Sequence, residues 1–202
     1  VELMVGLTVG LLVIAAAASV FADQLQHTRR SVVEARLHQD LRAAATLLVR
    51  DVRRAGHWQA ALRHTQWPTL DNPYREVTVS NAQQTIAYQY SRDEDADNDM
   101  VDAHEQFGFR VNQQVLYTRA GTGQWQSLTD RQVLRITRLQ FAIDTQAVLA
   151  EHACLTACGA GASACPQATV RLVHYDIEAQ AVPPHGDLRQ RLQGAVRVRN
   201  DS

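Results

Sequence analysis

The sequence contains no lysine, so all 20 of its basic residues are arginines, and they are balanced by 21 acidic residues. The formal net charge is therefore −1 at pH 7. A chain that binds nucleic acid mainly through its phosphates carries a clear excess of positive charge, and this chain has none. We predict no nucleic-acid partner, and we interpret the exclusive use of arginine as a trait of a GC-rich genome.

Catalytic motifs are also missing. The eight histidines are scattered, and none forms the HxxxH or HExxH spacing that a zinc enzyme needs. No serine or cysteine lies in a nucleophile elbow, and no phosphate-binding loop is present. The sequence therefore predicts that the protein is not an enzyme.

Charged residues are missing from residues 3–22, and proline is missing from the whole N-terminal run. A helix of about 20 apolar residues is roughly 30 Å long, which matches the hydrocarbon core of a bilayer. Residues 1–22 are therefore predicted to be the membrane half of one long helix.

The helix is predicted to continue without a break as an amphipathic half, residues 23–56, and to be followed by a β-rich domain at residues 57–202. Apolar residues recur at helical spacing and predict one buried stripe. Gly56 follows the last of them, and arginines precede it where cations favour the end of a helix dipole. The predicted stripe consists of Leu25, Val33, Leu37, Leu41, Ala44, Leu48, Val52 and Ala55.

Glu2 stands directly before the apolar run, where a carboxylate is costly unless it is paired. The segment VELMVGLTVGLLVIAAAA resembles the N-terminus of type IV prepilins, whose processed chains begin with a methylated Phe, then Thr-Leu-x-Glu and an apolar helix. Glu2 matches that glutamate, so the resemblance implies that it is the assembly residue. A generic membrane anchor is the alternative. We expect a leader ending in glycine to precede Val1, so that this chain is trimmed.

Arg29 and Arg30 follow the apolar run, and positive charge usually marks the cytoplasmic side. In prepilins, however, the leader carries compensating basic residues. The resemblance therefore implies a single pass through the inner membrane, with the domain in the periplasm and later in the pilus at the cell surface.

Alternating apolar and polar residues predict strands after the helix. The alternation of apolar and polar residues shifts by one position near Arg138, as a β-bulge would produce. A long helix followed by an antiparallel β-sheet is an α+β fold, and this order of elements is similar to that of type IV pilins. The predicted strands are residues 76–80, 85–90, 107–112, 115–119, 133–144, 170–177 and 188–198.

Three shorter segments resemble PilW-type minor pilins: residues 50–56, residues 107–110 after an acidic loop, and residues 196–200. This resemblance implies a minor pilin that helps to start or cap a type IV pilus. Its partners would be other minor pilins, the major pilin, the inner-membrane assembly platform and, as a further candidate, a tip adhesin. A minor pseudopilin of type II secretion and a membrane-anchored, calcium-dependent binding or adhesion module are the alternatives.

The stretch 93–105 resembles an EF-hand calcium loop and holds seven carboxylates in thirteen residues. Calcium binds six to eight oxygens, which alternate aspartates can supply. The final glutamate falls one residue late, and a solvated acidic loop is the alternative. The tentative Ca²⁺ ligands are Asp93, Asp95, Asp97, Asp99, Asp102 and Glu105.

Cys154, Cys158 and Cys165 are the only cysteines of the chain. In an oxidising compartment we expect one disulfide, and the pair Cys154–Cys165 is slightly favoured because it would tie the base of a glycine-rich loop. A zinc site would need a fourth ligand such as His152.

Overall fold

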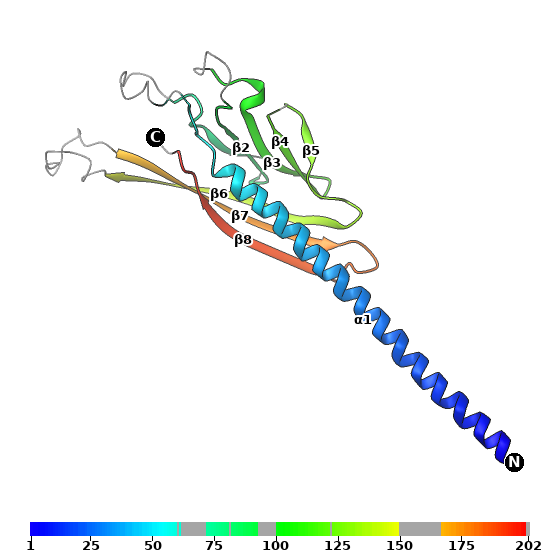
Figure 1. The fold of residues 1–202 in the computed structure, drawn as a ribbon. Coiled ribbons are helices and arrows are strands. Elements are labelled where there is room, and N and C mark those ends of the chain that lie inside the picture. Colours follow the sequence, from blue (N-terminus) through cyan, green and yellow to red (C-terminus); the bar gives the residue numbers. More distant parts are fainter. Residues whose placement is uncertain are drawn as a thin grey trace.

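The computed structural model describes residues 1–59, 61, 72–80, 82–92, 100–121, 123–149 and 167–200. These ranges contain one long helix, a short 3₁₀ helix and strands that form two antiparallel sheets (Figure 1). The elements are α1 (Glu2–Val52), β1 (Val77–Ser80), β2 (Thr85–Gln89), η1 (Ala103–Glu105), β3 (Gln106–Asn112), β4 (Val115–Ala120), β5 (Trp125–Ser127), β6 (Leu134–Leu149), β7 (Gln167–Ala181) and β8 (Arg189–Arg197). The predicted α+β, pilin-like arrangement is confirmed.

Helix α1 has 51 residues, and its two halves lie in different surroundings. Its N-terminal half projects far beyond the sheets, whereas its C-terminal half packs on β7 and β8 (Figure 1). The buried residues of α1 begin at Leu37 and follow the predicted apolar stripe through Leu41, Leu48 and Val52. Leu25, which we expected in that stripe, is exposed because the helix has not yet reached the domain at that point.

The end of α1 follows from its sequence. The helix stops at Val52, and Gly56 adopts a φ of 75°, a left-handed conformation that glycine adopts without steric cost. The Gly56 amide then donates a hydrogen bond to Gln89 O at 2.9 Å, which ties the helix end to β2.

The strands form two sheets instead of the single sheet that the sequence suggested. One sheet has the order β1-β2-β3-β4-β5, and the other has the order β6-β7-β8. Strand alternation reports which face of a strand is buried but not which strands pair, so it could not separate one sheet from two.

Two hairpin turns attach the first sheet to the free edge of β6. The Phe141 amide donates to Gln83 O, and the Ile136 amide donates to Gln114 O, both at 2.8 Å. Gln83 and Gln114 have positive φ values of 70° and 64° and belong to the turns that connect β1 to β2 and β3 to β4. These turns therefore satisfy two edge amides that would otherwise lack a partner in the described part of the chain.

Strands β6 and β7 are longer than predicted. The bulge near Arg138 is confirmed by a register shift between Ile136 and Arg138. Beyond Asp144, however, β6 continues to Leu149, and residues 145–148 are all exposed, so they show no alternation of burial that could have predicted this extension. The three-residue strand β5 was too short to be predicted.

The hydrophobic core joins α1 to both sheets. Ile86, Tyr88 and Phe109 from the first sheet and Phe141 and Ile177 from the second are all at most 1% exposed and belong to the same cluster as the buried stripe of α1. Burial of these large side chains supplies most of the stabilisation of the domain, because the hydrophobic effect grows with the apolar area removed from water.

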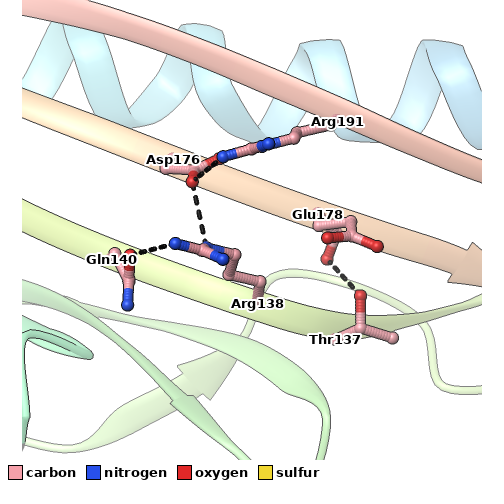
Figure 2. Close-up of polar contacts among 6 residues, drawn as sticks. All are labelled: Thr137, Arg138, Gln140, Asp176, Glu178 and Arg191. Carbon is pink, nitrogen blue, oxygen red and sulfur yellow. Dashed lines mark hydrogen bonds and ion pairs between the residues drawn. The ribbon is translucent and has the colours of Figure 1, made fainter.

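The solvent face of the second sheet carries a carboxylate that bridges two arginines (Figure 2). Asp176 Oδ1 and Oδ2 accept hydrogen bonds from Arg191 Nε at 2.8 Å and from Arg191 Nη2 at 2.6 Å, and Arg138 Nε lies 3.0 Å from Asp176 Oδ2. The hydrogen bond from Arg191 is the main reason why the pKa of Asp176 lies below its ordinary value. Asp176 thus links β6, β7 and β8.

We expect Asp176→Asn to lower the Tm of the domain at pH 7 by about 2–4 °C, a small effect because both arginines are half exposed and solvent screens the pair. A lowered carboxyl pKa stabilises the fold above the ordinary value of about 4, and this contribution is lost as the pH falls through the lowered pKa. The Tm difference should therefore shrink towards pH 3. Asp187→Asn, which removes the exposed pair with Arg30, is the control and should change Tm less. A difference that grows on acidification would contradict this prediction.

Candidate functional site

The N-terminal half of α1 is an apolar surface that the rest of the chain leaves uncovered. Residues 1–32 are all exposed. The most apolar stretch of 18 residues in this helix has a mean hydropathy of 2.4, and none of its residues is buried inside the protein. By length and composition, α1 can therefore cross a membrane. The exposed large apolar residues of this half are Val1, Leu3, Met4, Val5, Leu7, Val9, Leu11, Leu12, Val13, Ile14, Val20, Phe21, Leu25 and Val32. A surface of this size needs lipid or other apolar helices to cover it.

Glu2 lies in the first turn of α1 and is the one acidic residue before Asp23. The N-terminal end of a helix favours a negative charge, so this position suits a carboxylate. No described residue forms a hydrogen bond or ion pair with Glu2. In apolar surroundings a partner for Glu2 must therefore come from another molecule.

Small residues interrupt the bulky ones along the same half of α1. A Cβ atom added at Gly6 or Gly10 would meet nothing within 4 Å, so packing within the chain does not explain these glycines. Ala16 and Ala17 line an open hollow of about 790 Å³ on the helix surface together with the larger Val13, Val20 and Phe21. Small residues allow the backbones of two apolar helices to approach closely.

The predicted calcium loop is only partly described. Asp93, Asp95, Asp97 and Asp99 lie outside the described residues, whereas Asp102 and Glu105 lie within them. Among the described residues no group of three or more His, Cys, Asp or Glu side chains could hold a metal ion. The prediction of calcium binding therefore rests on the sequence.

Glu105 has a structural role that the sequence did not reveal. It is 7% exposed, and its Oε2 accepts hydrogen bonds from Tyr74 Oη at 2.8 Å and from the Asp102 amide at 3.0 Å. Its Oε1 accepts one from the Arg92 amide at 3.1 Å. Burial and then the hydrogen bond to Glu105 raise the pKa of Tyr74 far above its ordinary value. Glu105 thus holds together the two ends of the acidic stretch, at Arg92 and Asp102.

Cys154, Cys158 and Cys165 lie outside the described residues, as does His152. The disulfide therefore stays a prediction.

Sequence reasoning missed one cluster of charges. The sequence pattern indicated that Arg50, Arg53 and Arg54 complement the helix dipole. In the structure these three arginines line a groove at the end of α1, and Arg199 lines it too. Arg199 is far away in the sequence, so no local pattern could have found it.

Comparison with known proteins identifies the class of the chain. Residues 30–198 match the family model described as prepilin peptidase-dependent protein B. This match covers the C-terminal part of α1 and both sheets but not Glu2 or the apolar run. No curated protein and no solved structure matches the chain.

Proposed function

Since the chain belongs to the family of prepilin peptidase-dependent protein B, whose members are pilin-like structural proteins and not enzymes, we propose that it is a minor pilin that takes part in type IV pilus assembly as part of an initiation or tip complex. The observation that carries this proposal is the uncovered apolar half of α1 with the unpartnered Glu2 at its start. Such a helix fits a subunit that is held in a membrane and then extracted into a bundle of similar helices.

The proposed mechanism follows from the physics of this helix. Before assembly the subunit is held in the inner membrane, where lipid covers the apolar residues of α1 and the domain lies in the periplasm. On extraction, helices of neighbouring subunits replace the lipid. Glu2 then offsets the positive N-terminal end of a neighbouring helix in surroundings of low dielectric constant, where an unpaired charge is expensive.

The proposed partners follow from this mechanism. They are other minor pilins, the major pilin and the inner-membrane assembly platform, with a tip adhesin as a further candidate. Strands β7 and β8 of the second sheet pack on the C-terminal half of α1, so a neighbour whose helix continues along α1 from its apolar half would also approach these strands.

A deletion strain separates a minor pilin from a minor pseudopilin of type II secretion. We expect the strain to have few or no surface pili, to secrete its hydrolases normally, and to regain pili when the full chain is supplied again. Electron microscopy of the cells and assays of the secreted hydrolases measure the two outcomes. Normal pili together with failed secretion would contradict the proposal and identify a pseudopilin.

We further propose that the stretch 93–105 binds calcium. A carboxylate has about four lone-pair positions, and protein donors occupy three of those on Glu105. One position is thus left for an ion, and Asp93, Asp95, Asp97, Asp99 and Asp102 would supply the other ligands.

Calcium at about 100 times its dissociation constant should stabilise the fold by about 2.7 kcal/mol, because the ion binds the folded loop and hardly the unfolded chain. This corresponds to a rise in Tm of about 5–10 °C, which differential scanning fluorimetry with calcium and with chelator can measure. Asp95→Ala combined with Asp97→Ala should abolish the response. Identical melting of the wild type in calcium and in chelator would refute the site.

A further inference from the structure

A groove of about 630 Å³ lies where the last turns of α1 meet the chain segment that follows β8. Its volume is within the usual range of ligand-binding sites. We call it the arginine groove, and its lining residues are Thr46, Val49, Arg50, Arg53, Arg54, His57, Arg199 and Asn200.

The backbone holds Arg199 in this groove. The Arg199 amide donates to Arg53 O at 3.3 Å, and Asn200 Nδ2 donates to Arg54 O and Ala55 O, both at 3.4 Å. A Cβ atom on Gly56 would come within 2.7 Å of Asn200 O, so glycine at this position permits the close approach. The segment after β8 thus satisfies carbonyl groups at the end of α1 and, in doing so, adds a fourth arginine to those of the helix.

Among the described residues, few carboxylates lie close to the positive charges of the arginine groove. The helix dipole favours Arg50, Arg53 and Arg54 at the end of α1, but it gives no reason for Arg199 to join them. In the described part of the chain no carboxylate forms an ion pair with Arg50, Arg53 or Arg199. Burial raises the pKa of the nearby Asp51, and the charges of Arg54 and Arg50 only partly offset that rise.

One of the four guanidinium groups already has an aromatic support. The Arg54 guanidinium lies 4.4 Å from the centre of the Tyr90 ring, a cation–π contact that orients it without neutralising its charge. An anionic partner would therefore meet at least one positioned guanidinium group in the groove.

The position of the arginine groove along α1 excludes one source of negative charge. Arg50 lies 28 residues beyond Ala22, the last residue of the apolar run, which corresponds to about 40 Å of helix. Screening limits electrostatic attraction to about 8 Å at physiological ionic strength. The headgroups of the bilayer that holds the first half of α1 are therefore too far away, and a neighbouring protein is the source that can reach the groove.

We propose that the arginine groove binds an acidic, Asp- or Glu-rich segment of a neighbouring protein subunit. Guanidinium groups match carboxylates in planar, two-point hydrogen bonds, and two or more of them converging on one groove favour a segment with several carboxylates over a single anion. This contact is separate from the packing of apolar helices proposed above, and it would orient the domain relative to its neighbour.

The test uses the full chain in micelles of a zwitterionic detergent. The probe is a fluorescent, end-capped peptide Asp-Glu-Asp-Ala-Asp-Asn-Asp, which has the composition of residues 93–99 of this chain. We expect saturable binding by fluorescence anisotropy that weakens as salt is added. Arg53→Gln with Arg199→Gln should raise the dissociation constant about tenfold, because two charge-assisted contacts are lost.

Arg131→Gln with Arg135→Gln is the matched control, since it removes the same charge from two exposed arginines elsewhere and should change the dissociation constant less than about twofold. Arg50→Gln with Arg199→Gln is the alternative pair if the first does not fold by circular dichroism. Equal loss in both pairs would overturn the proposal, since it would indicate attraction by net charge alone. Equally tight binding of a peptide with Asn and Gln in place of Asp and Glu would also overturn it, as would displacement of the peptide by equimolar inorganic phosphate.

Discussion

A strain whose only copy of the gene encodes Glu2→Ala should keep normal amounts of the protein in its membrane but lose its surface pili at least about tenfold. Glu2 forms no hydrogen bond or ion pair with a described residue and is exposed, so its removal should not change the folded domain. In a bundle of apolar helices, however, removing one member of a buried charge pair leaves the other unpaired, which costs about 3–5 kcal/mol. In the variant, this cost is added at every assembly step in which the charge that normally pairs with Glu2 becomes buried.

Asp23→Ala is the matched control for Glu2→Ala. Asp23 is the first acidic residue after the apolar run, is exposed on the same helix, and lies outside the segment that a bilayer would cover. Pili are counted by electron microscopy, and the protein is quantified in membrane fractions by immunoblotting. Normal piliation of the Glu2→Ala strain would refute the assembly role, and so would loss of the protein from the membrane, which would place Glu2 in insertion or folding instead.

Glu105→Ala should destabilise the domain by about 3 kcal/mol, even in the presence of chelator. The substitution removes the buried acceptor of the Arg92 and Asp102 amides and leaves Tyr74 Oη with Met100 O, at 3.1 Å, in place of Glu105. Hydrogen bonds to a charged group contribute about 1.5–3 kcal/mol each, and part of that is recovered where water reaches the freed donors. The expected fall in Tm is about 6–12 °C.

Tyr74→Phe and Asp130→Ala are the comparison variants for this prediction. Tyr74→Phe removes one of the three donors and should cost about 1–1.5 kcal/mol. Asp130→Ala removes an exposed carboxylate that accepts a hydrogen bond from the Gln132 amide at 2.8 Å, and it should cost under about 1 kcal/mol. Thermal denaturation of all three variants is measured in chelator and again in calcium. If Glu105→Ala loses stability only when calcium is present, Glu105 acts through the ion and not through its three protein donors.

Local patterns in the sequence determined much of the fold. Charge-free residues, the absence of proline and apolar residues at helical spacing specified α1, and Gly56 marked its end to within about one turn, because each of these signals acts within one or two turns of a helix. The bulge near Arg138 was predictable for the same reason, since a bulge shifts the parity of burial within a few residues. The sequence also placed Glu2 before the apolar run, but the role of Glu2 remains a prediction.

Only the tertiary structure decided how these elements meet. Strand alternation could not tell one sheet from two, and nothing local predicted that the carbonyl groups of Gln83 and Gln114 accept hydrogen bonds from the edge of β6. Glu105 reads as an acidic loop residue in the sequence, but in the fold Tyr74, far from it along the chain, donates to its buried carboxylate. Arg199 reaches the arginine groove because the segment after β8 binds the end of α1. In each case the deciding contact joins residues distant in sequence, and the energy of such a contact depends on packing that no local pattern contains.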